Sequence, residues 1–175
     1  MIRKATINEV SVINEIYLDA KALFKSVGST QWLDTDGYPN QVSTTNDIKR
    51  DELYVKEVNG IVTAVASLTR EEETAYNKIY EGNWLNNDKY YTIHRIAVKK
   101  EYYGKGYAKE LMQYLENETI KDGIFNIKID TMENNTRMIK LLESIGYVRC
   151  GVIYLLRPNV LEKKRIGFQK VLKDN

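Results

Sequence analysis

Hydrophobic positions recur with a period of two in several short segments of the chain, and this period is typical of β-strands. In the segment 124–130, polar residues alternate with Phe125, Ile127 and Ile129. The runs 53–58, 61–69 and 90–99 are rich in β-branched and aromatic residues, which also favours strands. Asn59-Gly60 separates the first two runs and favours a type I′ hairpin turn. Further strands are expected at 2–6, 147–156 and 166–172.

Other segments place apolar residues three and four positions apart, as on one face of an α-helix. A helix capped by Asn8 is predicted from the spacing of Val12, Ile13, Ile16, Ala20, Leu23 and Phe24. A second helix over 105–122 is predicted from Leu111, Met112, Leu115 and Ile120. Shorter helices are expected at 44–52 and 135–144, and Gly146 should end the latter as a left-handed cap.

The order of these elements is strand, helices, strands, helix, strand, helix, strands. This order predicts an α+β fold with a mixed sheet and helices packed on it. No repeat and no linker divides the chain, so residues 1–175 are expected to form a single domain. Two segments, 28–40 and 71–84, follow neither period and are expected to be irregular.

Composition narrows the class of protein. A hydrophobic content of 43% and a charged content of 29% are ordinary for a globular chain. The net charge of +2 is spread without a dense basic stripe, which argues against a nucleic-acid partner. No run approaches the roughly 20 apolar residues of a membrane span. Cys150 is the only cysteine, which suits a reducing compartment, and we expect a cytoplasmic protein.

The segment 94–112, HRIAVKKEYYGKGYAKELM, combines a strand, a Gly104-Lys105-Gly106 turn and a helix that begins at once. Backbone N–H groups at a helix start lack internal partners and lie at the positive end of the helix dipole. Glycines let this backbone approach a bulky anion, so the segment predicts a phosphate cradle suited to a pyrophosphate. The alternative is a turn without a ligand. A dinucleotide fingerprint is not complete, because its third glycine position is Lys109.

The same segment resembles the acetyl-CoA-binding motif of the GNAT superfamily. That motif has a strand ending in Ala-Val, followed by Gln/Arg-x-x-Gly-x-Gly/Ala at the start of a helix. Ala97-Val98, Gly104, Gly106 and Ala108 match the motif, whereas Glu101 departs from its Gln/Arg position. Because the cradle is mainly backbone, this departure weakens only a side-chain contribution.

A second segment, 130–147, is similar to the strand–Asn–helix–Gly-Phe/Tyr part of the same family. The pairs Gln31-Trp32 and Tyr38-Pro39, with the strand His-Arg-Ile-Ala-Val, resemble a group of bacterial GNAT proteins. The resemblance implies a single-domain GNAT-like fold with a mixed, mostly antiparallel sheet and helices on both faces. It further implies acetyl-CoA as co-substrate, with no metal.

The resemblance also assigns residues to the co-substrate. A β-bulge is expected to splay the strand at 96–98, so that an N–H near Ile96 polarises the thioester carbonyl. Asn135 either contacts the pantetheine arm or caps its helix, and both roles are compatible. The residues expected at acetyl-CoA are Ile96, Ala97, Val98, Gly104, Lys105, Gly106, Tyr107, Ala108 and Asn135.

His94 is the single histidine and the candidate general base. Period-two spacing places it on one strand face with Thr92, Ile96 and Val98. Its ordinary pKa of about 6.5 suits a base near neutral pH, and some GNAT enzymes carry a histidine here. The alternative is a buried histidine that bonds a backbone carbonyl. The tyrosine acid of many relatives is replaced by Leu142, which leaves Tyr147, Tyr154 or water as proton donors.

The acceptor side is expected to draw on the two irregular segments. In the family such segments wall the acceptor site, and aromatic rings can hold an amine by cation–π contact. The candidates are Trp32, Tyr38, Tyr80 and Trp84, for which packing beneath long loops is the alternative. No metal is expected, because one histidine, one cysteine and scattered carboxylates form no ligand set.

Three functions follow from these residues. The leading one is transfer of an acetyl group from acetyl-CoA to a primary amine of a small molecule or peptide, by direct attack in a ternary complex. The second is a CoA-binding regulatory or catalytically weak GNAT-like module, which Leu142 favours. The third is a subunit that acts by association, with the closing strands offering an edge for a homodimer.

Overall fold

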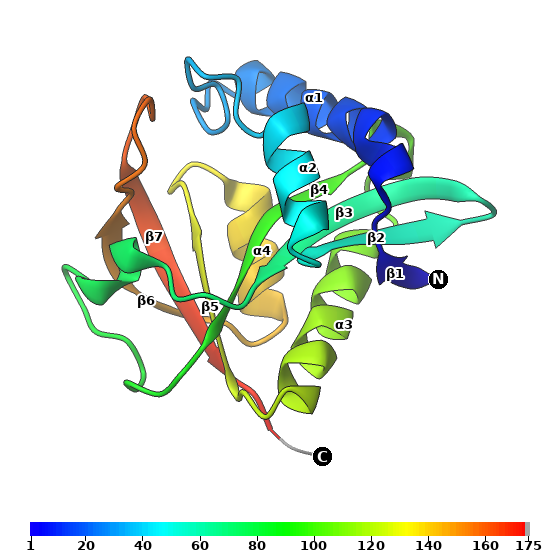
Figure 1. Ribbon diagram of the computed structural model, residues 1–175. Coiled ribbons are helices and arrows are strands. Elements are labelled where there is room, and N and C mark those ends of the chain that lie inside the picture. The colour runs from blue at the N-terminus through cyan, green and yellow to red at the C-terminus, as the bar shows by residue number, and fades with distance from the viewer. Residues whose placement is uncertain (174–175) are drawn as a thin grey trace.

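The computed structural model describes residues 1–173 and contains one seven-stranded sheet (Figure 1). Its strand order is β1-β2-β3-β4-β5-β7-β6. The predicted α+β fold with helices on both faces is confirmed. The strands are β1 (Ile2–Lys4), β2 (Leu53–Val58), β3 (Ile61–Thr69), β4 (Tyr91–Val98), β5 (Asn126–Thr131), β6 (Val148–Tyr154) and β7 (Lys164–Val171).

The centre of the sheet opens between β4 and β5. All neighbouring strands pair antiparallel except these two, which pair parallel. Their pairing covers only Tyr91–Ile127 and Thr92–Lys128. Beyond these residues the two strands diverge toward their carboxyl ends (Figure 1). The free backbone edges that result face each other across an opening.

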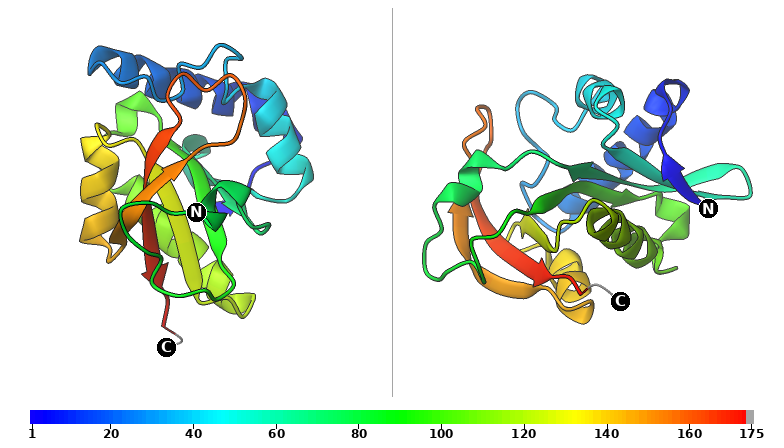
Figure 2. Two further views of the ribbon diagram at one scale, coloured as in Figure 1. Left: turned by 90° about the vertical axis from the view of Figure 1, so that its left-hand side faces the viewer. Right: turned by 60° about the horizontal axis from the view of Figure 1, so that its bottom comes forward.

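Helices cover both faces of the sheet (Figures 1 and 2). On one face, α1 (Val10–Ser26) and α2 (Gln41–Lys49) pack on β2 and β3 through a core that includes Ile16, Val55 and Val65. On the other face lie α3 (Tyr107–Lys121) and α4 (Thr136–Ser144), around Leu111, Leu115 and Phe168. Burial of these large apolar side chains is the main stabilising contribution.

Local signals at the element ends explain where the helices begin. Asn8 does not cap α1: it lies in a 3₁₀ turn, Ile7–Glu9, where the Glu9 carboxylate accepts a hydrogen bond from the Thr6 N–H at 2.8 Å. The helix predicted at 44–52 begins earlier, because Asn40 caps it by accepting from the Ser43 N–H at 3.0 Å. The predicted hairpin turn is confirmed by positive φ at Asn59 and Gly60, and Gly146 (φ +92°) ends α4.

The irregular segment before β4 runs along the outer side of β6. It contains a 3₁₀ turn, Thr74–Asn77, and then Tyr80 exchanges two 2.8 Å backbone hydrogen bonds with Val152. Gly82 is required nearby, because a Cβ there would lie 1.9 Å from the carbonyl oxygen of Cys150. This part of the edge predicted to serve a homodimer is therefore occupied by the chain itself. Among residues 1–173, no helix is long and apolar enough to cross a bilayer.

Candidate functional site

Two cavities meet where β4 and β5 diverge. The α3 cavity, of about 410 Å³, lies against the start of α3 and the end of β4. The loop cavity, of about 320 Å³, lies beneath the connections that follow α1 and β6. Both are lined by Phe24, Ile96, Asn135 and Met138. These four residues mark the junction at which contents of one cavity can meet contents of the other.

The start of α3 presents backbone N–H groups to the α3 cavity, where the sequence predicts a phosphate cradle. Gly104 and Gly106 both have φ +77°, and a Cβ at either would meet nothing within 4 Å. Within residues 1–173, the backbone N–H groups from Gly106 to Lys109 donate no hydrogen bond. Free N–H groups at the positive end of a helix dipole, beside open space, suit a pyrophosphate.

The structure brings the residues predicted to hold acetyl-CoA to this cavity, with one exception. Lys105 does not line it; its Nζ lies 5.5 Å from the centroid of the Tyr102 ring. The α3 cavity is lined by the other predicted residues, which are Ile96, Ala97, Val98, Gly104, Gly106, Tyr107, Ala108 and Asn135.

A β-bulge interrupts β4 at the junction of the cavities. Ala97 pairs with Val65 of β3 and His94 with Ser67, so two residues of β4 oppose one of β3. Arg95 takes up the extra residue with a left-handed φ of +53°. Such a bulge leaves backbone groups unpaired and turns successive side chains to new directions.

The bulge corrects the predicted strand face. Ile96 and Val98 pack on the α3–α4 core together with Ile93, whereas Ala97 packs on the α1–α2 core. His94 pairs with Ser67 and therefore does not share the face of Ile96 and Val98, because the inserted residue reverses the alternation after Arg95.

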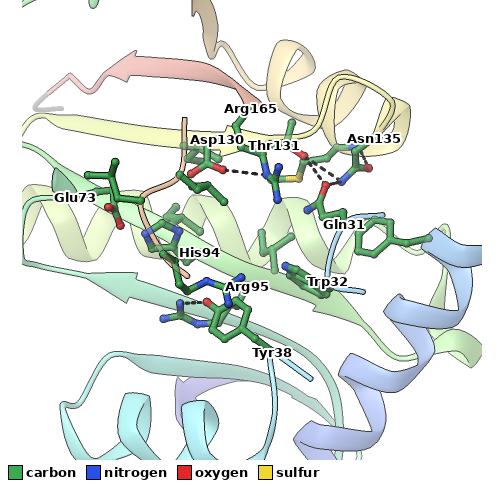
Figure 3. A pocket seen from close by; sticks show the side chains of 18 residues that line it. Gln31, Trp32, Tyr38, Glu73, His94, Arg95, Asp130, Thr131, Asn135 and Arg165 are labelled. Carbon is green, nitrogen blue, oxygen red and sulfur yellow. Dashed lines mark hydrogen bonds and ion pairs between the residues drawn. The ribbon is translucent and has the colours of Figure 1, made fainter. Parts of the chain in front are cut away.

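Asn135 holds the junction in place from the start of α4. Its Oδ1 accepts a hydrogen bond from the Met138 N–H at 3.3 Å, which makes it the helix cap. Its amide nitrogen donates to Thr131 Oγ1 at 3.1 Å and to Gln31 Oε1 at 3.3 Å. Gln31 thereby ties the irregular segment after α1 to the end of β5 (Figure 3).

Charged side chains line the loop cavity (Figure 3). Arg95 Nε lies 2.7 Å from Asp47 Oδ2, and its Nη2 donates to Ser67 Oγ at 3.0 Å. Arg165 Nε lies 3.9 Å from Asp130 Oδ1, and the Tyr76 hydroxyl donates to Asp130 Oδ2 at 2.6 Å. Burial raises the pKa of Asp130, and these two neighbours oppose that rise.

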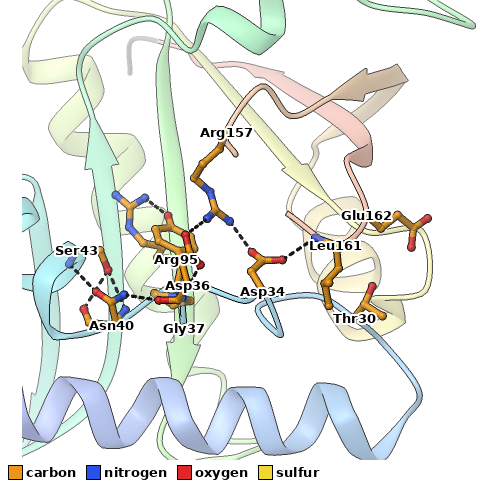
Figure 4. Close-up of polar contacts among 12 residues, drawn as sticks. Thr30, Asp34, Asp36, Gly37, Asn40, Ser43, Arg95, Arg157, Leu161 and Glu162 are labelled. Carbon is orange, nitrogen blue, oxygen red and sulfur yellow. Dashed lines mark hydrogen bonds and ion pairs between the residues drawn. The ribbon is translucent and has the colours of Figure 1, made fainter. Parts of the chain in front are cut away.

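Arg157 connects the two loops above the cavity (Figure 4). Its guanidinium lies 2.6 Å from Asp34 Oδ2, 3.1 Å from Asp36 Oδ2, and 3.9 Å above the centroid of the Tyr38 ring. Asp34 also accepts a hydrogen bond from the Leu161 N–H at 3.1 Å. The 155–163 segment is therefore fastened over the irregular segment after α1 and roofs the loop cavity.

Comparison with known proteins identifies the family. The family model described as Acetyltransferase (GNAT) family matches residues 14–147, which is most of the chain. The chain belongs to the GNAT acetyltransferase family. A search among curated proteins finds no match.

Solved structures agree with this assignment. A GNAT-family acetyltransferase from Streptococcus agalactiae is 32% identical, with a TM-score of 0.88, over 99% of this chain and 96% of that one. One from Listeria monocytogenes is 22% identical, with a TM-score of 0.74, over 98% and 94%. The Salmonella typhimurium protein yncA, solved with acetyl-CoA, is 20% identical, with a TM-score of 0.67, over 100% and 95%. The last two, below 25% identity, support the fold alone.

In this GNAT acetyltransferase, His94 lines the loop cavity beside Arg95. Burial, and then the positive charge of Arg95, lower the pKa of His94 to about 3. The sequence analysis used the ordinary pKa of about 6.5, because neither the partial burial of the ring nor the position of the Arg95 guanidinium can be read from the sequence. The imidazole is therefore neutral at physiological pH.

The lowered pKa of His94 predicts a specific dependence of stability on pH. Below pH ~6.5 the unfolded chain protonates this histidine but the folded chain does not, so the parent loses stability as the pH falls toward 3. The loss is at most about 1.4 kcal/mol per pH unit. We expect the melting temperature of His94→Gln to rise relative to the parent between pH 7.5 and 4.5. A constant difference across that range would contradict the lowered pKa.

Two aromatic residues predicted at the acceptor site reach the loop cavity and two do not. Trp32 and Tyr38 line it, and Trp32 packs edge-on against Tyr17 and Phe24. Tyr80 lies outside it against Tyr154, with ring centroids 5.3 Å apart. Trp84 lies outside it too, near Tyr76 and over Gly167, because the segment 78–84 follows β6 rather than the opening.

The candidate proton donors also lie elsewhere. Neither Tyr147 nor Tyr154 lines either cavity, and Tyr147 is buried near Glu116 and Lys170. Leu142 is fully buried in the α3–α4 core. Within residues 1–173, no three His, Cys, Asp or Glu side chains are grouped to hold a metal ion.

Sequence reasoning missed Glu73, Arg95, Asp130, Arg157 and Arg165 as lining residues of the loop cavity. Arg95 was visible only as a neighbour of His94. Arg157 and its partner Asp34 are separated by 123 positions, so no local motif connects them. Their shared location follows from the way two irregular connections cross over the sheet opening.

Proposed function

We propose that this acetyltransferase moves the acetyl group of acetyl-CoA to a primary amine by direct attack in a ternary complex. The observation that carries the proposal is the junction of the two cavities at Phe24, Ile96, Asn135 and Met138. One cavity has an anion cradle for the nucleotide end of CoA, and the other is polar and roofed. Two substrates bound in these cavities meet at the junction, and proximity of this kind supplies much of the acceleration.

Acetyl-CoA fits the α3 cavity by its chemistry. The pyrophosphate is assigned to the free N–H groups at the start of α3, and the pantetheine arm to the backbone of Ile96, Ala97 and Val98. The thioester then lies beside the bulge, where an unpaired N–H near Ile96 can stabilise the oxyanion. The Salmonella typhimurium protein of the same fold was solved with acetyl-CoA, which is consistent with acetyl-CoA as the co-substrate proposed here.

His94 is proposed to accept the proton that the amine loses. The amine reaches the junction as the free base, its ammonium proton having gone to bulk water. Its nitrogen then bonds to the carbonyl carbon, which makes its N–H strongly acidic, and the C–S bond breaks to release CoA thiolate after that proton has passed to the imidazole. A neutral imidazole with a lowered pKa can accept a proton at that stage even though it is a weak base toward a free ammonium ion. With Leu142 at the usual acid position, water is the proposed proton donor to the thiolate.

A cytoplasmic location is part of the proposal. The one cysteine, Cys150, is buried and free, as suits a reducing compartment.

The experiment measures release of CoA thiol from acetyl-CoA with a panel of primary amines, with and without EDTA. We expect amine-dependent release that EDTA leaves unchanged. Tight CoA binding with no release for any amine would instead favour the second candidate, a CoA-binding module, which the burial of Leu142 supports. Activity lost in EDTA and restored by a divalent ion would contradict the metal-free reaction.

A further inference from the structure

The charged side chains that line the loop cavity differ in whether they have a partner of opposite charge. Each of its three arginines already has a carboxylate of the chain beside it. The pairs are Arg95–Asp47 at 2.7 Å, Arg157–Asp34 at 2.6 Å and Arg165–Asp130 at 3.9 Å. No guanidinium of the cavity is therefore left without an opposite charge. An anionic ligand at Arg95 or Arg157 would compete with a carboxylate that already lies within 2.7 Å of the guanidinium.

Glu73 is the lining carboxylate that has no cation. Within residues 1–173 it makes no ion pair, and its one side-chain hydrogen bond comes from the Ala75 N–H at 3.2 Å. The other lining carboxylate, Asp130, is held by Tyr76 and Arg165. Among the described residues, Glu73 is thus the one carboxylate of the lining without a cation partner, and it offers a contact for a cationic group of a ligand.

Glu73 lies at the end of the loop cavity away from the junction. Figure 3 places Glu73 on one side of the cavity and Asn135 on the opposite side, with His94 and Asp130 between them. Asn135 also lines the α3 cavity, so the thioester belongs at that end. An amine that reacts at the junction would therefore lie at the opposite end of the cavity from Glu73. The Glu73 carboxylate would then contact a second group of the same acceptor.

We propose that the acceptor is a small diamine, whose far ammonium group binds the Glu73 carboxylate while its near amine is acetylated at the junction. This inference rests on the proposed function and names its acceptor class. A cavity of about 320 Å³ roofed by the Arg157 contacts suits a small molecule better than a protein segment. Glu73 is a binding residue that fixes the acceptor's orientation and takes no part in bond formation.

The test compares acceptors that differ only at the far end. Acetyl transfer is measured for a series of α,ω-diamines, the amino alcohols and the ω-amino acids of the same lengths. In the parent protein, the best diamine should exceed its amino alcohol in kcat/KM by about 10- to 100-fold, the usual range for one charge-assisted contact. The ω-amino acid should be the poorest acceptor. This discrimination needs no variant and is therefore independent of folding.

Glu73→Gln should lower kcat/KM for the diamine to the level of the amino alcohol. Glutamine keeps an oxygen for the Ala75 N–H, so the local turn is retained. The matched control is Glu72→Gln, which removes the same charge from an exposed neighbour outside the cavity and should preserve the preference. Calorimetry of the diamine with the CoA-loaded protein measures its binding without turnover.

The outcomes separate the acceptor class from the reaction. Diamine preference that is lost in Glu73→Gln and kept in Glu72→Gln supports both. Acetylation of amines without a diamine preference, or with a preference that Glu73→Gln leaves intact, overturns the diamine proposal and leaves the reaction standing. If the diamine binds in a way that depends on Glu73 but is not acetylated, the binding site is supported and the proposed reaction is overturned. If the diamine is neither bound nor acetylated, and no other amine is acetylated, both the diamine proposal and the proposed reaction are overturned.

Discussion

The Gly106→Asp variant is expected to raise the dissociation constant for CoA by about 100-fold or more, since loss of contacts to a charged group costs roughly 1.5–3 kcal/mol each. Gly106 directly precedes α3, and a side chain there would enter the open space next to the free N–H groups. An aspartate adds bulk and a negative charge where the pyrophosphate should sit, so both repulsion and lost approach weaken binding. Isothermal calorimetry with CoA measures the change.

Gly60→Asp is the matched control for Gly106→Asp. Gly60 has the same φ of +77°, and a Cβ there also meets nothing within 4 Å. It lies in the β2–β3 turn, outside both cavities, so it reproduces the backbone strain and the added charge without touching the cradle. If both variants lose the same CoA affinity, backbone strain or added charge alone explains the loss, and the assignment of the cradle to the start of α3 is contradicted.

His94→Ala is expected to lower kcat/KM for the amine by roughly 10²-fold, the lower end of the range for a positioned base. CoA affinity should stay close to that of the parent, because His94 lines the loop cavity and not the α3 cavity. With a pKa of about 3, His94 contributes no limb to the pH profile between pH 5 and 9. The parent and the variant should therefore differ by a constant factor across that range.

A purely structural histidine predicts a different result. His94→Ala would then melt earlier, and the protein that stays folded would turn over at nearly the parent rate. A limb near pH 6.5 in the parent that disappears in the variant would instead show that the pKa of His94 is not lowered in the working enzyme. If the variant melts normally, binds CoA and turns over at the parent rate, a group other than His94 accepts the proton.

The co-substrate side was predictable because its signals are local. A glycine before a helix and free N–H groups at its first turn belong to one short stretch of sequence, and Gly104 and Gly106 lie in the α3 cavity as expected. The cap at Asn135 is local in the same way. Such features depend on a few adjacent dihedral angles, which the residue types themselves favour.

The acceptor side was less predictable because it is built by tertiary contacts. Period-two spacing assumes a regular strand. The extra residue at Arg95 reverses which face of the sheet the side chains after it point to. The path of the segment before β4 depends on the pairing of Tyr80 with Val152, which carries Trp84 away from the opening. That Glu73 has no cation partner among the described residues is seen only once the partners of the three arginines that line the cavity are known.

The short pairing of β4 with β5 has a further consequence for the apo protein. Two residue pairs form the β4–β5 pairing between the two halves of the sheet, and backbone groups that face the opening beyond them need other partners, such as a side chain, water or a ligand. The α3 cavity is lined by Ile96 of β4 and by Met138, which follows β5, so a co-substrate bound there as proposed would contact both sides of the opening. A bound co-substrate would bridge the two strands. At a free concentration of 100 times its dissociation constant, it would raise the free energy of unfolding by about 2.7 kcal/mol. The line along which the sheet is most weakly joined is thus the line along which substrate binding strengthens it.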